Sequence, residues 1–487
     1  MICVTVTPTS RTLAKADLLN AARQGDIVEL CLDHFHREPD VKDLISAIQK
    51  PLIVSCRRLQ DGGKWQGSEE ERLLLLRQAI VAGPAYIELD LDIAAQIPRF
   101  GNTKRVISFT RLDRPETEID AIFDEAAAAK ADLVKFTWPT PTLNAAWPLL
   151  SAVTRKRSLP VVGMGLGPAE LTFSLLGKKY GSPWIYAALE KGMEAYPGQA
   201  TIFELVETYH CREIDPRTAF IAVAGFGPAQ VATTRIFNAG FQQLGIHARC
   251  LPIELGDVRS LKRMLDTLKI KAILAPGHQG DALFSLADSI APADAASGTL
   301  NLLSKQESGW IGYNTLWKAA LKSLEREFQQ EGRTLSQMNT FILGATGLGH
   351  SLAYAVGQKK GPVSICGTDD RSTQKIASTC GCRFVPFQNL YETLADLLVI
   401  ADARIVAGTH KGQLNPSLFR PSLTVLDIAH LPVDSPLMEE ARNRGSRVID
   451  GFGLYQQLMS EQFRAMTGKE LPEAAIAQGM SGLTSAD

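Results

Sequence analysis

The chain has 487 residues, which is too long for one hydrophobic core and predicts two or three globular units. Its 45% hydrophobic and 21% charged residues are ordinary for a soluble protein, and its formal net charge of −1 creates no global field for nucleic acid or an anionic membrane. These values favour a small-molecule partner, and we expect neither a nucleic-acid nor a membrane partner.

The N-terminus and the cysteines indicate the compartment. No basic segment with an apolar core and cleavage site opens the chain, and no apolar run approaches the roughly 20 residues that span a bilayer. The eight cysteines are scattered, and several lie in apolar runs, which suits a reducing cytoplasm better than a disulfide framework. Cys380 and Cys382 suggest a metal or redox pair, but without a second pair or a nearby His they lack zinc-finger spacing, and we expect no metal.

The N-terminal part of the chain alternates short apolar runs with longer amphipathic stretches such as Glu69 to Val81 and Glu116 to Lys130. Eight β-like runs, most followed by helix-like sequence, predict an α/β fold with an N-terminal (βα)8 TIM barrel. Such barrels place their chemistry at the C-terminal ends of the strands. The eight runs are Ile2 to Val6, Ile27 to Leu32, Leu52 to Cys56, Tyr86 to Leu91, Arg105 to Phe109, Asp132 to Phe136, Pro160 to Gly163 and Trp184 to Ala187.

The pattern restarts after Tyr209 and predicts a second α/β unit. Ala219 to Ala224 and Ala272 to Ala275 have the composition of strands, and Thr233 to Leu244 has that of a helix. We expect the C-terminal segment 451–487 to be helical and to pack back on the lobe that precedes the nucleotide-binding segment. The expected domains are residues 1–210, 218–325, 338–450 and 451–487.

A glycine-rich turn opens the third segment. The strand-like residues Phe341 to Leu343 run into Gly344-Ala-Thr-Gly347-Leu-Gly349 and then into an apolar helical stretch. This arrangement lets backbone N–H groups face a pyrophosphate, so it predicts a Rossmann-type lobe with the three glycines in the cofactor site. The alternative is a Rossmann-like unit that serves only packing.

Lys135 lies at the end of the strand-like run Ala131 to Phe136, so we expect its amine to point into the mouth of the barrel. A lysine in a partly desolvated pocket loses its proton more readily and can attack a carbonyl to form a Schiff base. The alternative is a lysine that caps a strand end on the surface.

Five segments at successive strand ends follow one another in a recognisable order. They are Val28 to Phe35, Val54 to Arg57 with Asp61 to Gly63, Ala131 to Phe136, Tyr180 to Ser182, and Tyr196 to Gln199. Over about residues 1 to 210 the chain therefore resembles the type I 3-dehydroquinate dehydratases. The resemblance implies an imine on Lys135, a substrate carboxylate and hydroxyls held by Arg57 and Gln199, and a polar site lined by Glu29 and Asp61. Asp61 stands where the family usually carries Glu.

Four further positions depart from the family pattern. Thr110 stands where the resemblance implies the general acid/base histidine, and a hydroxyl does not shuttle a proton near pH 7 as imidazole does. Cys31 and Ser174 replace two expected arginines, which should weaken the grip on a carboxylate. Ala195 replaces the lid serine.

His34 and His36 lie just past the second strand and are the nearest histidines that could replace the missing base. His34 also fits the family's own Asp-His-Phe sequence. We therefore interpret it as a loop residue.

A second series of short motifs follows in order along residues 218 to 487. They are Gly298 to Asn301, Ile311 to Thr315, Gly344 to Gly349, Thr409 to Gly412, Ser435 to Met438, and Phe463 to Gly468. Together they resemble the motifs of shikimate dehydrogenases. The resemblance implies reduction of a ketone, which needs a nicotinamide against the carbonyl and a proton donor beside its oxygen.

The lysine and aspartate that this second resemblance implies are missing. Leu316 stands where the aspartate is expected, and the lysine falls in Gly277 to Gly280, where His278 is either a substitute proton donor or a structural loop residue.

The family's two substrate-binding serines become Val231 and Thr233 in an alignment without gaps. A valine cannot hold a carboxylate, whereas a threonine hydroxyl can still donate or accept a hydrogen bond. Asn238 and Asn301 remain, so we expect Thr233, Asn238 and Asn301 to bind the substrate.

The cofactor is expected to be NAD or NADP. Asp369 and Asp370, about 20 residues after the glycine turn, are placed to meet a ribose 2′-hydroxyl and favour NAD. Arg371 could instead accept a 2′-phosphate, and Thr409 belongs to the same implied site, so the choice stays open.

The two resemblances together imply a shikimate-pathway protein of aromatic amino acid biosynthesis that dehydrates 3-dehydroquinate and then reduces the product to shikimate. One alternative is a pseudoenzyme that acts as a scaffold or small-molecule sensor. Another is a different Schiff-base reaction on Lys135, of the lyase or aldol type, in which Asp61 or water moves protons. The sequence leaves a homodimer, the true substrate and transfer of an intermediate between the halves open.

Overall fold

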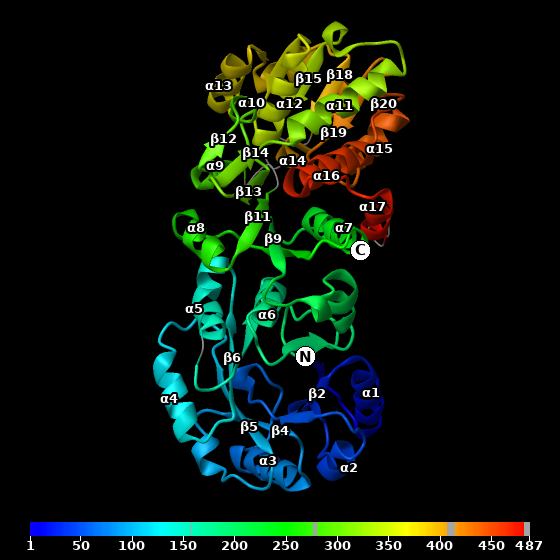
Figure 1. Ribbon diagram of the computed structural model, residues 1–487. Helices are drawn as coiled ribbons and strands as arrows, with labels where there is room; N and C mark the ends of the chain where they lie inside the picture. Colours follow the sequence, from blue (N-terminus) through cyan, green and yellow to red (C-terminus); the bar gives the residue numbers. More distant parts are fainter. Residues whose placement is uncertain (156, 276–279, 407–413, 482–487) are drawn as a thin grey trace. The chain divides into compact units, whose positions relative to one another are not determined.

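The computed structural model describes residues 1–155, 157–275, 280–406 and 414–481 (Figure 1). The chain forms two compact units, Met1–Phe220 with Leu244–Lys269, and Ile221–Gln243 with Ile270–Asp487. The strand β10 (Ala248–Ile253) and the helix α8 (Val258–Thr267) therefore belong to the first unit. The domain limits expected from the sequence stay a prediction.

The first unit contains a nearly closed parallel barrel, which confirms the predicted fold. Its eight strands follow the spatial order β7-β6-β5-β4-β3-β2-β1-β8. One α-helix follows each of the strands β1, β2, β3, β5, β6 and β7, in the order α1 (Arg11–Gln24), α2 (Val41–Ile45), α3 (Glu69–Ala82), α4 (Asp120–Ala128), α5 (Leu143–Thr154) and α6 (Glu170–Lys179). The strands are β1 (Ile2–Val6), β2 (Ile27–Cys31), β3 (Leu52–Ser55), β4 (Tyr86–Asp90), β5 (Lys104–Thr110), β6 (Leu133–Pro139), β7 (Val161–Leu166) and β8 (Ile185–Ala188).

Side-chain alternation along β6 decides which residues enter the barrel. Phe136 packs against Phe123 of α4 with ring centroids 5.5 Å apart, and against Trp138 at 5.1 Å. These even-numbered residues therefore face the helix layer. Because successive strand residues point to opposite faces, Lys135 and Thr137 face the barrel interior.

The second unit begins with a mixed sheet in which the neighbours run β9-β11-β13-β14-β12. β13 is antiparallel to both of its neighbours. The C-terminal helix α16 (Gly451–Thr467) packs on α7 (Pro228–Gln243), since Phe463 lies 5.3 Å from Phe241 between ring centroids. The strands are β9 (Ala219–Ala224), β11 (Ile270–Leu274), β12 (Ser289–Ile290), β13 (Leu302–Gln306) and β14 (Gly309–Tyr313).

The rest of the second unit is a doubly wound parallel sheet, which confirms the predicted Rossmann-type lobe. The strand order is β17-β16-β15-β18-β19-β20, so the connections change direction beside β15, where such sheets bind ligands. The helices α11 (Leu316–Gln329), α12 (Gly347–Gln358), α13 (Asp370–Cys380) and α15 (Pro436–Asn443) accompany it. The strands are β15 (Thr340–Leu343), β16 (Val363–Cys366), β17 (Arg383–Phe384), β18 (Leu397–Ile400), β19 (Thr424–Asp427) and β20 (Arg447–Val448).

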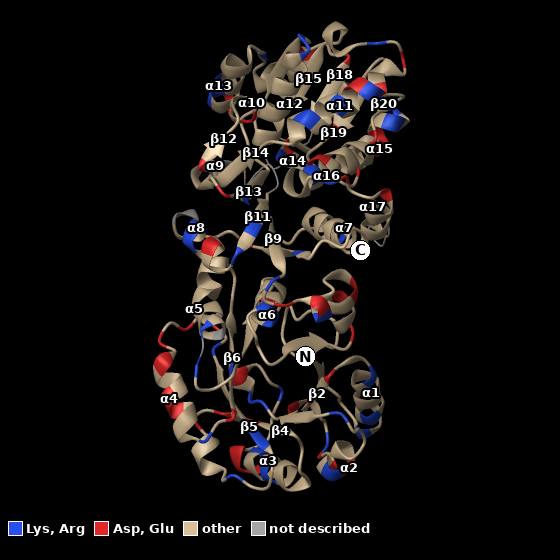
Figure 2. Ribbon diagram, viewed as in Figure 1, with Lys and Arg blue, Asp and Glu red and all other residues tan. Residues whose placement is uncertain are grey.

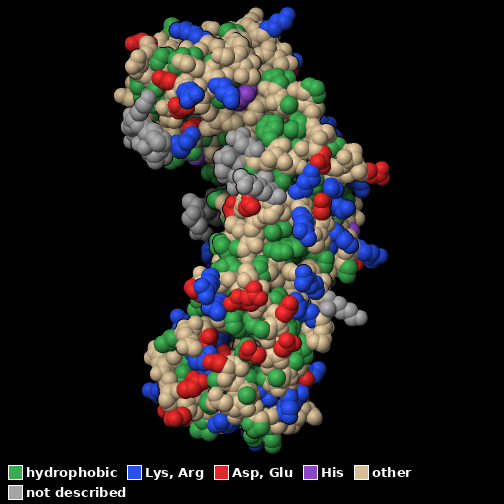
Figure 3. Space-filling view, turned by 90° about the vertical axis from the view of Figure 1, so that its left-hand side faces the viewer, with side chains coloured by type: hydrophobic (Ala, Val, Ile, Leu, Met, Phe, Trp, Pro, Cys, Tyr) green, Lys and Arg blue, Asp and Glu red, His purple; other side chains and the backbone are tan. Residues whose placement is uncertain are grey.

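Charged residues of both signs are mixed in each unit (Figure 2), in keeping with the net charge of −1. The face drawn in Figure 3 shows the same mixture, with acidic and basic side chains interspersed among hydrophobic ones.

Among the described residues, no helix combines the length and the apolar character needed to cross a membrane.

Candidate active sites

Four side chains from alternate barrel strands meet in the interior of the first unit. Glu29 comes from β2, Glu88 from β4, Lys135 from β6 and Tyr186 from β8, and none of them is more than 5% exposed. A layer of four side chains from alternate strands is how small parallel barrels fill their interior. Here that layer is charged, which is rare in a core unless the charges compensate one another. Lys135 is therefore not a surface cap.

The amine of Lys135 is held by two carboxylates and an aromatic ring. Its Nζ donates a hydrogen bond to Oε2 of Glu88 at 2.8 Å and lies 3.7 Å from Oε1 of Glu29. It also lies 4.5 Å from the centroid of the Tyr186 ring. Burial favours the neutral amine, but Glu29 and Glu88 outweigh burial and raise the pKa of Lys135 well above its usual value. The expectation that desolvation makes this lysine lose its proton readily is therefore wrong.

The pKa values of the two carboxyl groups shift in opposite directions. Burial raises the pKa of Glu88, although Lys135 opposes the shift. Burial acts on Glu29 too, but Lys135 and Arg57 outweigh it and hold the pKa of Glu29 below its usual value. Glu88 is thus the carboxylate of the pair that more easily carries a proton.

Two buried oxygen atoms of this layer have no hydrogen-bond partner among the described residues. They are Oε1 of Glu29 and the hydroxyl of Tyr186. Buried polar groups are normally hydrogen-bonded, so such atoms mark places where a ligand or water completes the bonding.

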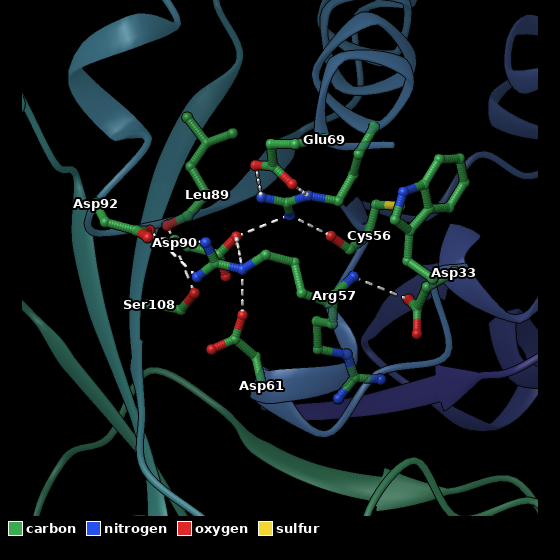
Figure 4. Close-up of polar contacts among 12 residues, drawn as sticks. Asp33, Cys56, Arg57, Asp61, Glu69, Leu89, Asp90, Asp92 and Ser108 are labelled. Atoms are coloured by element: carbon green, nitrogen blue, oxygen red, sulfur yellow. Dashed lines mark hydrogen bonds and ion pairs between the residues drawn. The ribbon is translucent and has the colours of Figure 1, made fainter. Parts of the chain in front are cut away.

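Arg57, just past β3, presents an unsatisfied guanidinium beside this layer. Nη2 donates to Sγ of Cys31 at 3.2 Å, whereas Nε and Nη1 are buried without a hydrogen-bond partner among the described residues. The Tyr196 ring stacks over the guanidinium at 4.4 Å from its centroid. The backbone N–H of Arg57 donates to Asp33 at 3.1 Å (Figure 4), which fixes the start of the loop.

Asp61 and Gln199 are bonded to the protein itself. Asp61 accepts a hydrogen bond from Nε of Arg58 at 2.5 Å, in a cluster that also includes Asp90 and Asp92 (Figure 4). Gln199 donates to Oγ1 of Thr5 at 2.6 Å and accepts from the backbone of Ala195 at 2.8 Å. The sequence grouped both residues with Lys135, but Oδ2 of Asp61 and both side-chain polar atoms of Gln199 already have partners.

The positions that depart from the expected pattern have their own local roles. Cys31 accepts from Arg57, and Ser174 donates to the buried carboxylate of Glu170. Burial raises the pKa of Glu170 to about 7. Thr110 pairs in register with Thr137 at the end of β5. A carboxyl group therefore lies beside Ser174, the position where the resemblance implied an arginine.

Among the described residues, neither His34 nor His36 forms a hydrogen bond or an ion pair with Lys135. His34 ends a short helical turn, and its Nε2 lies 3.6 Å from Oδ2 of Asp33. Burial lowers the pKa of His34, so the ring is neutral near pH 7. Both histidines line a separate cavity of about 790 Å³.

The second unit contains a cavity of about 760 Å³ between the mixed sheet and the glycine turn. Thr233 and Asn301 line it. Leu316, which stands where an aspartate was expected, also lines it. Oγ1 of Thr299 and Oε1 of Gln462 are buried in its wall without a hydrogen-bond partner among the described residues.

Tyr455 adds a polar group that the sequence did not indicate. Its hydroxyl lies 2.9 Å from Oγ1 of Thr233, and both residues line the same cavity. Asn238 is fully buried on α7 and is not among the residues that line it.

The glycine turn has the shape that a dinucleotide requires. Gly344 adopts φ +129°, and a Cβ at Gly349 would overlap the carbonyl oxygen of Gly344. Thr346 caps α12 by accepting from the backbone of Gly349 and itself donates to Ala401 at 2.7 Å. Ala345 to Leu348 line the cavity, so the free N–H groups of the helix start border it. These residues fit NAD(P).

Two further cofactor candidates, Asp369 and Arg371, are not among the residues that line this cavity. Asp369 is exposed and caps α13 by accepting from the backbone of Ser372 at 2.9 Å, and Arg371 is exposed in the first turn of that helix. His278 and Thr409 lie outside the described residues.

The sequence analysis missed Glu88 and Tyr186 as residues of the barrel site. The sequence could have indicated them, because each lies two strands away from the strand of Lys135, and alternate strands contribute to the same layer of a barrel.

Comparison with known proteins agrees with the division seen in the fold. Residues 2–216 match the family model of Type I 3-dehydroquinase. The chain is 22% identical over 488 residues to the bifunctional 3-dehydroquinate dehydratase/shikimate dehydrogenase of Arabidopsis thaliana, covering 94% of this chain and 80% of the relative. It is 22% identical over 476 residues to the shikimate biosynthesis protein AroDE of Chlamydia pneumoniae, covering 95% and 94%. The solved shikimate dehydrogenase of Aquifex aeolicus is 20% identical with a TM-score of 0.48, over 54% of this chain and 98% of that one.

Proposed function

This chain is a fusion of a type I 3-dehydroquinase domain with a shikimate-dehydrogenase-like half, and on that premise we propose that its barrel is a Schiff-base lyase that dehydrates 3-dehydroquinate on Lys135. The observation that carries the proposal is the hydrogen bond of 2.8 Å between Nζ of Lys135 and Oε2 of Glu88 inside the barrel. An ammonium cannot attack a carbonyl, so the lysine needs a neighbouring proton acceptor. Glu88 supplies it.

The proton path follows from that contact. Glu88 takes a proton from the ammonium, and the free amine adds to the substrate ketone to form a carbinolamine. The carbinolamine hydroxyl accepts the one proton that Glu88 holds and leaves as water, which gives the protonated imine and restores the carboxylate. The protonated imine acidifies the neighbouring carbon, whose proton passes to the Glu88 carboxylate and from there to the departing β-hydroxyl, which leaves as a second water. Hydrolysis releases the enone and restores the lysine. Glu88 thereby performs the task that Thr110 cannot.

Arg57 is the residue proposed to hold the substrate carboxylate. Its two unpartnered N–H groups can form charge-assisted hydrogen bonds, which are about twice as strong as neutral ones. The free hydroxyl of Tyr186 and the free Oε1 of Glu29 are candidates for the substrate hydroxyls. Asp61 and Gln199 then act through the loops that they hold, since their polar atoms bond to Arg58 and Thr5.

We propose that the cavity of the second unit binds NAD(P) and a small hydroxylated substrate. The turn from Ala345 to Leu348 would hold the pyrophosphate, and Thr233, Thr299 and Asn301 would hold the substrate. NAD(P) supplies or accepts a hydride when bound. The proton donor expected at His278 belongs to the same proposal. Asp369 and Arg371 leave the choice between NAD and NADP to measurement.

A non-catalytic scaffold or sensor is the second candidate, and one observation favours it. Lys135 is 1% exposed, and the Tyr196 ring covers Arg57, so the protein's own side chains cover both groups. The charges of the carboxylates Glu29 and Glu88 and of the cations Lys135 and Arg57 also compensate one another without a ligand. A different imine reaction is the third candidate, although its suggested proton carrier Asp61 is bonded to Arg58.

Borohydride trapping on the full chain separates these functions. We expect 3-dehydroquinate to give conjugated-enone absorbance and, with borohydride, a reduced adduct that maps to Lys135 and is lost in Lys135→Ala. Lys50→Ala, which removes an exposed lysine, serves as the matched control. No product and no adduct at high protein concentration would support the scaffold, whereas adducts with other keto acids but no enone would support altered imine chemistry.

A further inference from the structure

Two cysteines flank the end of α13 in a defined backbone geometry. The helix ends at Cys380, Gly381 adopts the left-handed conformation with φ +66°, and Cys382 follows. The backbone N–H groups of Gly381 and Cys382 both donate to the carbonyl of Ala377, the latter at 2.8 Å. This helix end holds the two cysteines one residue apart on a rigid support.

The two thiols lie together and are half-buried. Sγ of Cys382 is 3.7 Å from the carbonyl oxygen of Cys380, and both side chains pack against the same apolar cluster. Cys380 interacts electrostatically with Cys382 and with His350. These two contacts, Cys382 first, lower the pKa of Cys380 to about 5, whereas the pKa of Cys382 rises.

The third member of this group, His350, comes from α12, which packs beside α13 (Figure 1). Its ring lies against Gly298, where any Cβ would overlap Nδ1. Its Nε2 is buried without a hydrogen-bond partner among the described residues. The close fit at Gly298 restricts the position of the imidazole ring.

The other six cysteines differ from this pair. Cys3, Cys31, Cys56, Cys211, Cys250 and Cys366 are all buried. Burial raises the thiol pKa of the first five of them. Thiolate character and access together decide which cysteines react, so the reactive ones are expected at the end of α13.

We propose that Cys380 and Cys382 form a reversible disulfide and so constitute a thiol–disulfide exchange site separate from both candidate active sites. The Cys380 thiolate attacks a small organic disulfide of the glutathione type, forming a mixed disulfide and releasing one thiolate. Cys382 then loses its proton and attacks Sγ of Cys380, which releases the second thiolate. Two electrons pass from the protein thiols to the reagent, which leaves as two thiols.

Oxidised glutathione on the native full-length chain is the direct test. We expect intact mass to fall by two hydrogens, peptide mapping to join Cys380 to Cys382, and dithiothreitol to reverse the change. In Cys382→Ser the reaction should stop at a glutathione adduct on Cys380. Ser378→Ala, on an exposed position of the same helix turn, should behave as the parent chain.

The pH profile of alkylation tests the role of the neighbours. Between pH 6 and 8 the iodoacetamide rate at Cys380 should stay nearly constant, whereas an ordinary thiol accelerates about tenfold per pH unit. His350→Gln should move the midpoint of the Cys380 profile upward. The proposal fails if oxidised glutathione leaves all eight thiols free, or if the adduct on Cys380 persists with Cys382 intact.

Discussion

The Nζ atom of Lys135 lies 2.8 Å from Oε2 of Glu88, and both side chains are buried inside the barrel. This contact stabilises the ammonium form and at the same time supplies the group that can remove its proton. The same pair therefore contributes to the stability of the barrel interior and, in the proposed reaction, to its reactivity.

Glu88→Gln should lower the dehydratase rate by about 10² to 10⁴, because an amide keeps the size of the side chain but accepts no proton. It should also lower the pKa of Lys135, since one of the two carboxylates that raise it is gone. Borohydride trapping should then reach its midpoint at a lower pH than in the parent chain. Glu125→Gln, which changes an exposed carboxylate, is the control, and equal rates for Glu88→Gln and the parent would rule out the proton transfer.

Lys135→Met should destabilise the first unit by about 3 to 5 kcal/mol at pH 7, since Glu29 and Glu88 would be buried without their cation. Losing the cation raises the pKa of both carboxyl groups, so the deficit should shrink as the pH falls and they become neutral. Urea unfolding at pH 7 and pH 5 measures this, with Lys50→Met as control. The double variant with Glu88→Gln should recover part of the loss, and an equal deficit at both pH values would contradict the charge argument.

Glu170 should make the stability of the first unit depend on pH. Its pKa is about 7 in the folded chain and near 4.5 ordinarily, so the folded state keeps a proton that the unfolded state has lost between these values. The contribution of Glu170 to stability is therefore largest below pH 4.5 and is lost as the pH rises to 7, by about 3 kcal/mol in all. Glu170→Gln should remove this slope. Parallel unfolding curves for variant and parent across pH 5 to 8 would show that the shift does not exist.

Gly349→Ala should weaken nucleotide binding roughly tenfold or more, because the added Cβ overlaps the carbonyl oxygen of Gly344 and distorts the turn. Gly357→Ala is the matched control in the same helix, since a Cβ there meets nothing within 4 Å. It should bind normally and gain about 0.5 to 1 kcal/mol of stability. Titration with NADH and NADPH measures both variants and identifies the preferred cofactor. Equal affinity in Gly349→Ala and the parent would move the cofactor away from this turn.

Local sequence patterns determined the fold class of this protein. Eight apolar runs separated by amphipathic stretches predicted the barrel, because each strand buries its own residues and its neighbours follow in chain order. The glycine turn predicted the Rossmann-type lobe for a similar reason, since only glycine fits where the backbone of Gly344 meets the start of α12. Lys135 was recognisable because it interrupts an apolar strand.

Only the tertiary structure decided the surroundings of the chemically active groups. Glu88 lies 47 residues before Lys135, and their contact depends on the alternation of strands around the barrel. It reverses the expected effect of burial on the lysine. His350 reaches Cys380 in the same way, although no His is close to that cysteine in the chain. The charge state of a buried group depends on partners from distant segments, and a local pattern does not contain them.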